Sequence, residues 1–523
     1  MTETLAGLNP EQAEAVQTTN GPMLIMAGAG SGKTKVLTCR IAHLLQQGVR
    51  PYRILAITFT NKAAAEMRER VDKMAGAAAK DVWLFTFHAF CARFLRMEIT
   101  KLGGYGSNFA IYDSSDIQNL IKQILKELNL DEKRFQPAGI ASRISNAKNQ
   151  LQSVSDFSKA ASDFYNQKVA EIYERYQNKL LVNNAVDFDD LLVLSIRLLQ
   201  ESEEVRAKYQ ERFDYLLVDE YQDTNGVQEM IFRAVSRDNL FMVGDLKQSI
   251  YGFRGCNSKL FEEKERAFTA DGRVKYLNYN FRSAPEIIDN VNRIFDHCMK
   301  ADFSGVDYAG TSRLVSGGLY GERRGRFSLD ILRAEKKKRV YAEPRVYDIL
   351  EESAEGEEFA LGNFLADLIE REIGKDYFDA ESGCMRRVGY GDVAVLLRSR
   401  GSLAERLVKQ LLRRGIPSEA EAGSVVDYAE IKALTDVLRL VDNFRQDVPL
   451  CSALKNLYSF TDEELAEIRL YADAHAPDAA GERTFCDAYD TALGADTALG
   501  EKLRSFDKYI KKLRLYAAQA RAA

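Results

Sequence analysis

The sequence predicts an α/β protein built on a parallel β-sheet. Its N-terminal part alternates short apolar runs with segments of helical periodicity, as at Ile54–Phe59 and Val82–Phe85. A glycine-rich segment, residues 27–34, lies between the apolar run Met23–Met26 and a helix-like segment. A further apolar run, residues 215–218, ends in two carboxylates. An apolar strand, a glycine-rich turn and a helix in this order are typical of a phosphate-binding loop.

Helical periodicity replaces the strand pattern over residues 92–208. Strand patterns return at Tyr215–Val218 and Leu240–Val243, so the helical block is interpreted as an insertion within one α/β domain. A second α/β set is expected from about Lys275, with its clearest late strand at Asp392–Leu397, and helices are expected beyond it.

The composition is that of an ordinary globular protein. The chain has 523 residues, 46% hydrophobic and 28% charged. No apolar stretch approaches the ~20 residues of a membrane span, and the N-terminus has no signal-like start, so we expect a cytoplasmic protein without membrane contact.

The seven cysteines form no Cys-x-x-Cys pair, which argues against structural zinc or an iron–sulfur cluster. The net charge of −5 argues mildly against a nucleic-acid partner. We interpret the basic clusters 323–326 and 336–339 as solvated faces.

Four residues have the types and positions that nucleoside triphosphate hydrolysis requires. Lys33 is placed to reach the β- and γ-phosphates, and the Thr34 hydroxyl to hold Mg²⁺. Asp219 follows a buried strand and is a second candidate Mg²⁺ ligand, direct or through water. Glu220 is a candidate base for the attacking water.

Other residues have both a functional and a structural interpretation. Gln12 precedes the glycine-rich segment, and its amide matches an adenine edge, but a lone glutamine has many structural roles. Gln248 follows a strand, where it can sense the γ-phosphate. Tyr251 and Phe253 are either base-stacking platforms or core aromatics of a packed loop. Arg282 is either an arginine finger from a second domain or a surface charge. Its neighbour, the Phe281 ring, is a candidate for stacking on adenine.

The order of these motifs resembles that of superfamily 1 DNA helicases of the UvrD/Rep/PcrA and RecB/AddA group. The matching stretches are LNPEQ (8–12), AGAGSGKT (27–34), ITFTNKAAAEMRERV (57–71), TFHAF (86–90), VDFDDLL (186–192), LLVDEYQDTN (216–225), GDLKQSIYGFRG (244–255), NFRS (280–283) and GDVAVLLRS (391–399). The first half is most similar to the UvrD/PcrA branch, whereas GDLKQSIYGFRG and residues 437–450 are closer to AddA.

The resemblance implies an ATP- and Mg²⁺-dependent 3′–5′ translocase and helicase acting in DNA repair or recombination. The implied DNA partner is a single strand or a duplex junction with a 3′ single-stranded tail. The implied fold has two RecA-like domains, each with a helical insertion. The expected domains are 1–91 with 209–266 (domain 1A), 92–208 (insertion 1B), 267–425 (domain 2A, partial) and 426–523 (insertion 2B, partial).

The resemblance also implies specific site residues. The catalytic residues are Lys33, Asp219, Glu220, Gln248 and Arg282, and the metal ligands are Thr34 and Asp219. The nucleotide contacts are Gln12, Ala27, Gly28, Ala29, Gly30, Ser31, Gly32, Lys33, Thr34, Lys35 and Phe281. The DNA contacts are Thr58, Phe59, Thr86, Phe87, His88, Tyr251 and Phe253.

The chain departs from the family pattern at several points. Phe281 stands where the PcrA-like branch often has tyrosine, and Phe253 where it has tryptophan. Residues 384–523 contain no Thr-x-His-x-x-Lys-Gly-Leu-Glu-Phe-like or Val-Ala-x-Thr-Arg-Ala-like stretch, and no nuclease-like cluster is found. We therefore expect a C-terminally truncated helicase. One alternative is a module that binds ATP and DNA but hydrolyses little ATP unless a partner chain, such as a second helicase or nuclease subunit, supplies the missing motifs. Another alternative is an RNA-directed translocase.

Overall fold

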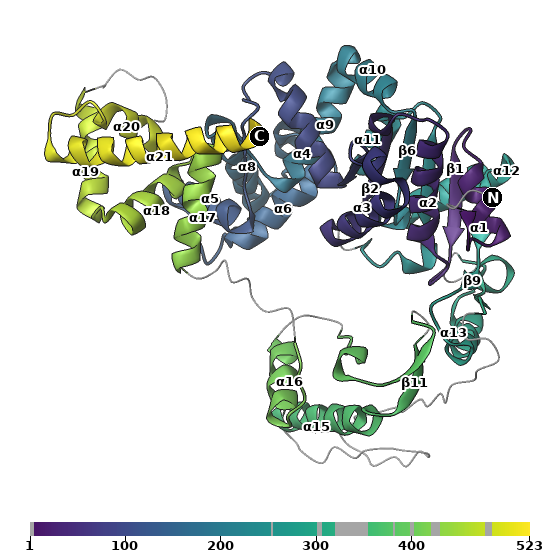
Figure 1. Ribbon diagram of the computed structural model, residues 1–523. Helices are drawn as coiled ribbons and strands as arrows, with labels where there is room; N and C mark the ends of the chain where they lie inside the picture. The colour runs from purple at the N-terminus through teal and green to yellow at the C-terminus, as the bar shows by residue number, and fades with distance from the viewer. Residues whose placement is uncertain are drawn as a thin grey trace. The chain divides into compact units, whose positions relative to one another are not determined.

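The computed structural model describes residues 5–252, 255–300, 306–318, 354–379, 382–397, 402–419, 429–475 and 484–522. The chain divides into two compact units (Figure 1). Unit 1 contains residues 1–27, 33–277 and 425–523, and unit 2 contains residues 28–32 and 278–424. The two units are described separately.

Unit 1 is built around a six-stranded sheet with the strand order β3-β2-β6-β7-β1-β8. All neighbouring strands in it are parallel, which confirms the predicted α/β class. The strands are β1 (Met23–Ala27), β2 (Ile54–Thr58), β3 (Trp83–Thr86), β6 (Tyr215–Val218), β7 (Leu240–Gly244) and β8 (Val274–Leu277).

The sheet has a hydrophobic core on each face. Leu24 and Met26 of β1 belong to one core, whereas Met23 and Ile25 belong to the other, as the two-residue period of a strand requires. A strand buried on both sides is apolar throughout, which explains the continuous apolar runs. The first core includes helices α4 (Phe87–Glu98), α9 (Phe188–Glu201) and α11 (Gly226–Val235), and the second includes α1 (Pro10–Gln17), α2 (Lys33–Gln46) and α3 (Asn61–Ala75).

The last strand of the sheet differs from the expectation. The segment from Lys275 was expected to open a second α/β set, yet β8 pairs with β1, with Ile25 opposite Lys275. The first sheet therefore extends beyond residue 266. Apolar patterning identifies a strand, but it does not show which sheet the strand joins.

The helical insertion has a core of its own, formed by α5 (Ser114–Glu127), α6 (Pro137–Asn149) and α8 (Phe164–Val182). The C-terminal helices of unit 1 form a further core, contributed by α17 (Ala429–Asp442), α18 (Asp447–Tyr458), α19 (Asp462–His475), α20 (Phe485–Ala492) and α21 (Ala498–Ala522). Arg439 of α17 connects the two groups, because its guanidinium lies 2.9 Å from Asp113 and 3.4 Å from Asp116.

Unit 2 contains short strands and helices. Its strands are β9 (Tyr279–Asn280) with β10 (Val315–Ser316), and β11 (Asp376–Asp379) with β12 (Cys384–Arg387); its helices include α13 (Pro285–Cys298), α15 (Ala354–Glu372) and α16 (Ser402–Arg413). The predicted strand Asp392–Leu397 is wrong: Asp392 ends a 3-10 turn, Val393–Leu397 is irregular, and Leu396 is 93% exposed. No strand within the described ranges pairs with it. The basic clusters 323–326 and 336–339 lie outside the described residues.

Candidate nucleotide and DNA site

The glycine-rich loop joins the end of β1 to the start of α2. β1 ends at Ala27 and α2 begins at Lys33. Gly30 and Gly32 have φ angles of 68° and 83°, which glycine adopts without the strain that a side chain would cause. The Ser31 amide donates to the Gly28 carbonyl over 3.2 Å. The loop thus has the tight turn before a helix N-terminus that suits an anion.

Lys33 brings together residues that are distant in the sequence. Its Nζ donates to Gln248 Oε1 over 3.2 Å and lies 3.6 Å from Glu220 Oε2. The Lys33 side chain is only 11% exposed. Gln248 is itself held by Asp245, whose Oδ2 accepts from Gln248 Nε2 over 2.8 Å. Three of the predicted catalytic side chains therefore converge on one point.

Asp219 and Glu220 lie directly after β6. Burial, and then the negative charge of Glu220, raise the pKa of Asp219 to about 7. The side chain of Thr34 forms a hydrogen bond with Asp219, which acts in the opposite direction. The two predicted metal ligands are therefore adjacent, and a divalent cation would relieve the cost of the buried carboxylate.

Sequence reasoning missed Gln222, although it contacts Glu220 directly. Its Nε2 donates to Glu220 Oε2 over 2.6 Å, and its Oε1 accepts from the Asp245 amide over 3.0 Å. Gln222 is 2% exposed. One buried amide thus joins the loop after β6 to the loop after β7. The position of Gln222 in LLVDEYQDTN (216–225) could have indicated a role, but the sequence does not show the contact between distant loops.

Gln12 has a structural role in the first turn of α1. Its Oε1 accepts from the Asn9 amide over 3.1 Å, and its own amide donates to Asn9 Oδ1 over 2.8 Å. This reciprocal pair is a capping box. The nearby Lys35 donates from Nζ to the Gly7 carbonyl over 2.8 Å. Both side chains therefore have structural contacts, and their predicted nucleotide contacts stay predictions.

In unit 2, the NFRS segment packs against the glycine-rich loop. The Phe281 amide donates to the Gly30 carbonyl over 2.9 Å. Asn280 is 4% exposed, and its Oδ1 accepts from the amides of Arg282 and Ser283, over 2.8 Å each. Asn280 thus shapes the turn that carries Arg282, although sequence reasoning assigned it no role. The position of Asn280 as the first residue of NFRS (280–283) could have indicated this role.

The predicted DNA residues differ in exposure. Thr58, Thr86 and Phe87 are buried, at 1%, 8% and 2% exposure. The Phe87 ring lies in the core, 5.5 Å from the Phe59 ring. Phe59 and His88 are half-buried. Burial lowers the pKa of His88. Of these side chains, Phe59 and His88 are the ones with enough exposed surface to meet a ligand.

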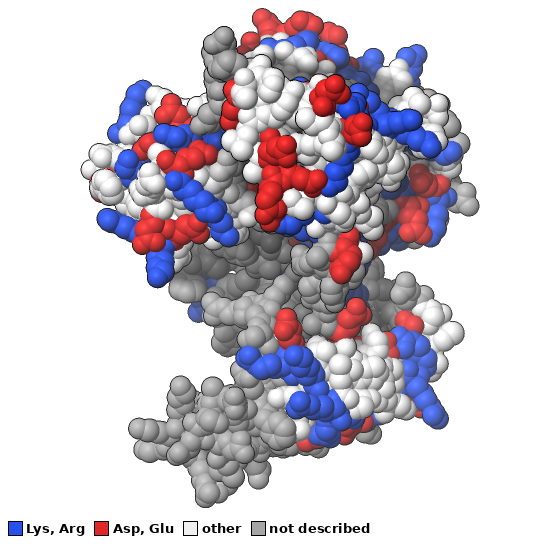
Figure 2. All heavy atoms as spheres, turned by 90° about the vertical axis from the view of Figure 1, so that its left-hand side faces the viewer, with Lys and Arg blue, Asp and Glu red and all other residues white. Residues whose placement is uncertain are grey.

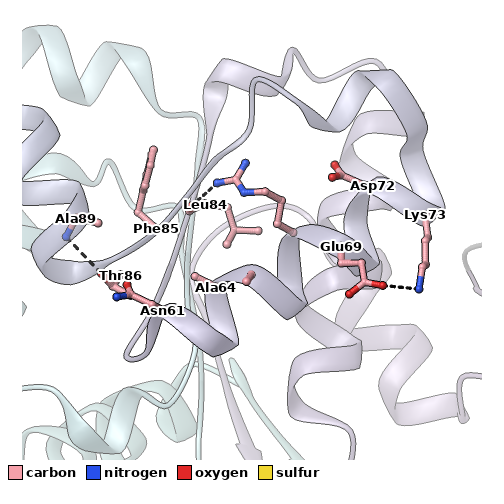
Figure 3. A pocket seen from close by; sticks show the side chains of 11 residues that line it. Asn61, Ala64, Glu69, Asp72, Lys73, Leu84, Phe85, Thr86 and Ala89 are labelled. Atoms are coloured by element: carbon pink, nitrogen blue, oxygen red, sulfur yellow. Dashed lines mark hydrogen bonds and ion pairs between the residues drawn. The ribbon is translucent and has the colours of Figure 1, made fainter. Parts of the chain in front are cut away.

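A pocket of about 650 Å³ lies beside Thr86, between α3 and the edge strand β3 (Figure 3). Thr86 caps α4 there by accepting from the Ala89 amide over 3.3 Å. Arg68 of α3 donates to the Leu84 carbonyl over 2.6 Å. Asn61 and Phe85 also line the pocket. Its walls thus combine an aromatic ring with polar side chains, next to the segments predicted to contact DNA.

Phe188 is a further exposed aromatic residue that sequence reasoning did not select. It begins α9 and is 51% exposed, and its ring centroid lies 5.5 Å from that of His88. Tyr251 is 36% exposed, and Phe253 lies outside the described residues. On the face drawn in Figure 2, acidic and basic side chains are interspersed. His88, Phe188 and Tyr251 offer aromatic surface on which a base of a nucleic acid can stack.

The described residues contain no group of three or more His, Cys, Asp and Glu side chains that could hold a metal ion. No helix in the described part of the chain is both long and apolar enough to cross a membrane.

The parallel sheet, the glycine-rich loop and the carboxylates after β6 define an α/β protein of the RecA-like class. The model of the UvrD/REP helicase N-terminal domain matches residues 8–269. The chain therefore belongs to the UvrD/REP helicase family, as the order of its motifs predicted.

Individual relatives are similar over different lengths. The ATP-dependent DNA helicase PcrA of Bacillus subtilis (strain 168) is 48% identical over 293 residues, which are 55% of this chain and 39% of that protein. The ATP-dependent DNA helicase PcrA of Staphylococcus aureus (strain Mu50 / ATCC 700699) is 37% identical over 454 residues, which are 86% of this chain and 56% of that protein. The chain spans about half the length of the curated relatives it matches.

Proposed function

We propose that this chain hydrolyses ATP and uses the energy to move 3′–5′ along single-stranded DNA, as the motor of a DNA helicase. The observation that carries the proposal is the convergence of Lys33, Gln248 and Glu220, with Lys33 Nζ at 3.2 Å and 3.6 Å from the other two side chains. A cation, a γ-phosphate sensor and a base held together are what phosphoryl transfer to water needs. Membership of the UvrD/REP helicase family supports the same function.

Each of these side chains would have a distinct role. Lys33 would bind the β- and γ-phosphates, and Glu220 would orient and polarise the attacking water. Gln248, in the loop after β7, would contact the γ-phosphate, so that the loop would respond to whether the γ-phosphate is present. Gln222 would keep the Glu220 carboxylate in place through its 2.6 Å hydrogen bond. Gln12, the glycine-rich loop and the Phe281 ring would bind the rest of the nucleotide.

The residues present fit Mg²⁺ as the cofactor. Mg²⁺ prefers hard oxygen ligands and usually binds through one or two side chains together with phosphate oxygens and water. The Thr34 hydroxyl and the Asp219 carboxylate are such ligands, and they lie within hydrogen-bonding reach of each other. When bound, Mg²⁺ supplies neutralisation of the charge that develops on the phosphates.

Coupling to DNA would use the aromatic residues at the same end of the sheet. Phe59, His88 and Tyr251 would stack on bases, and phosphate contacts would add affinity independent of sequence. Arg282 would act as the arginine finger, and its turn is held by Asn280 Oδ1, which accepts from the Arg282 amide over 2.8 Å. The proposed substrates are single strands and junctions with a 3′ tail, in repair or recombination.

Directional displacement of streptavidin tests this function. The chain would be incubated with ATP and oligonucleotides that carry biotin–streptavidin at either the 5′ or the 3′ end. We expect faster release from the 5′ end, because a 3′–5′ translocase moves toward it, and no such release with Lys33→Ala. Faster release from the 3′ end, or equal release without ATP, would contradict the proposal.

A second candidate function is a module that binds ATP and DNA with little turnover unless a partner, such as a second helicase or nuclease subunit, completes the site. The observation behind it is that residues 384–523 contain no Thr-x-His-x-x-Lys-Gly-Leu-Glu-Phe-like and no Val-Ala-x-Thr-Arg-Ala-like stretch. Under this alternative, the chain would bind both ligands with ordinary affinity and release no streptavidin from either end.

A further inference from the structure

A buried ionic cluster fixes the end of α6 against the start of α9. Lys148 Nζ lies 2.6 Å from Asp187 Oδ2 and 2.8 Å from Asp190 Oδ1, and all three side chains are at most 4% exposed. The Tyr176 hydroxyl donates to Asp187 over 2.9 Å, and Gln177 Nε2 donates to Asp190 over 3.0 Å. Each charged group thus has at least two polar partners.

Such a cluster fixes the relative position of two helices more than it raises the free energy of unfolding. Removing these three charges from water is costly, and their attraction offsets the cost only when the geometry is well defined. Apolar residues would hold two helices together equally well. The Lys148 cluster instead sets one register between the last turn of α6 and the first turn of α9.

This register also positions Asn149, the residue after Lys148. Asn149 donates from Nδ2 to Asp189 Oδ1 over 2.8 Å, and its Oδ1 accepts from Asn225 Nδ2 over 3.4 Å. Asn225 is the N-cap of α11 and forms a capping box with Gln228. Asn149 is therefore the point at which the helical insertion, α9 and α11 meet.

The two hydrogen-bond partners of Asn149, Asp189 and Asn225, lie close in the sequence to residues with a proposed function. Asn225 ends the segment that begins with Asp219 and Glu220. On its other side, Asn225 pairs with Cys256, whose sulfur donates to the Asp223 carbonyl over 2.8 Å. Asp189, in turn, follows Phe188, whose ring contacts His88. Two hydrogen bonds at Asn149 thus connect Asp189, the residue after Phe188, with Asn225, the last residue of the segment that begins at Asp219.

We propose that Asn149 is a positioning residue that couples DNA binding at His88 and Phe188 to the loop carrying Asp219 and Glu220. The inference rests on the proposed function, because it assumes that nucleotide and DNA bind at these places. A base that stacks on Phe188 shifts the first turn of α9. Asp189, Asn149 and Asn225 transmit this shift to the loop after β6.

The test measures the coupling between the two ligands directly. The affinity for a fluorescent ATP analogue is measured with and without saturating oligo-dT, and the ratio of the two dissociation constants gives the coupling. Coupled sites commonly differ by about 5- to 150-fold. We expect Asn149→Ala to bring the ratio close to one, while the affinity for the analogue alone changes less than about twofold.

A charge-exchange pair distinguishes positioning from general damage. Asn149→Asp alone places two carboxylates at the 2.8 Å contact with residue 189 and should abolish the coupling. Adding Asp189→Asn restores one donor and one acceptor, so the double variant should regain the ratio of the wild type. The control is Asn183→Ala, which removes an amide of the same insertion that donates to the Tyr112 hydroxyl over 3.2 Å, and it should leave the ratio unchanged.

The outcomes separate the inference from the function on which it rests. If the wild-type chain binds neither the analogue nor oligo-dT, the proposed function is wrong and the inference falls with it. If the wild type binds both without coupling, or if Asn149→Ala retains the coupling, the role of Asn149 is refuted while ATP and DNA binding stand. Failure of the double variant to restore the ratio would also overturn the role of Asn149.

Discussion

At the scale of single residues, Glu220 combines an unusual backbone with the proposed chemistry. Its φ angle is 50°, a left-handed conformation that costs a residue with a side chain on the order of 1 kcal/mol. The turn directs its carboxylate toward Lys33 and Gln222, at 3.6 Å and 2.6 Å. The strain therefore has a structural consequence, because an extended backbone would carry the carboxylate elsewhere.

Glu220→Gln should retain ATP binding and hydrolyse slowly. The amide is isosteric but cannot accept a proton from water, and loss of a general base costs about 10²–10⁴-fold. The turnover number and the affinity for an ATP analogue would be measured together. The matched control is Glu132→Gln, at an exposed position, which should behave as the wild type. Full turnover in Glu220→Gln would remove Glu220 from this role.

His88 should contribute to DNA binding as a neutral ring. Burial lowers its pKa, so the imidazole stays uncharged until the pH falls below the ordinary histidine value of about 6.5. We therefore expect the affinity for oligo-dT to have the same pH dependence between pH 8 and pH 7 in the wild type and in His88→Gln. An affinity that increases on acidification only in the wild type would show a charged contact instead.

At the scale of elements, Arg40 holds α1 against α2. Its guanidinium donates to the carbonyls of Ala15 and Thr18, over 2.8 Å and 2.6 Å, and lies 4.1 Å from the centroid of the Phe241 ring. Burial lowers the pKa of Arg40 to about 10, so it remains charged at neutral pH. The position of the helix that carries Gln12 thus depends on a buried cation.

Arg40→Ala should lower the free energy of unfolding by about 2–4 kcal/mol, since it leaves two carbonyls without this donor and opens a cavity. Denaturant unfolding measures the change. Arg70→Ala is the control, because Arg70 of α3 is half exposed and pairs with Glu66 only at 3.8 Å; it should cost less than about 0.5 kcal/mol. An Arg40 variant as stable as the control would show that α1 is held by other contacts.

Gly30→Ala should abolish nucleotide binding. An added Cβ would lie 2.7 Å from Asn280 Oδ1, at a residue whose φ angle is 68°, so both the loop and the NFRS turn would have to move. Titration with an ATP analogue measures the loss. Gly226→Ala is the control, since nothing lies within 4 Å of its added Cβ. Normal binding by Gly30→Ala would mean that the loop tolerates the displacement.

Much of the fold was predictable because buried parallel strands are continuous apolar runs. Five strands of the sheet were found in this way, but the partner of Val274–Leu277 and the irregular Val393–Leu397 were not. Pairing depends on contacts between distant segments, which periodicity does not encode. The same holds for the site. Lys33 and Asp219 belong to local motifs, whereas the contacts of Gln222 with Glu220 and Asp245 appear only after folding.

At the scale of the whole molecule, membership of the UvrD/REP helicase family and the convergence of side chains at Lys33 both support the proposed function, ATP hydrolysis coupled to movement along DNA. The net charge of −5 is no obstacle to it, because net charge does not describe local patches. Unit 1 carries the sheet with Lys33, and unit 2 carries the turn with Arg282. Under the proposed function, closure of the two units on ATP and their opening after hydrolysis would move one relative to the other.

The most direct test is the ATPase rate of the 523-residue chain with and without single-stranded DNA, measured beside Lys33→Ala. The account predicts hydrolysis that DNA stimulates and that the Lys33 variant lacks, since Lys33 is the cation that Gln248 and Glu220 contact. Hydrolysis that is equal in both proteins, or a wild-type chain that binds ATP without hydrolysing it in the presence of DNA, would contradict the account.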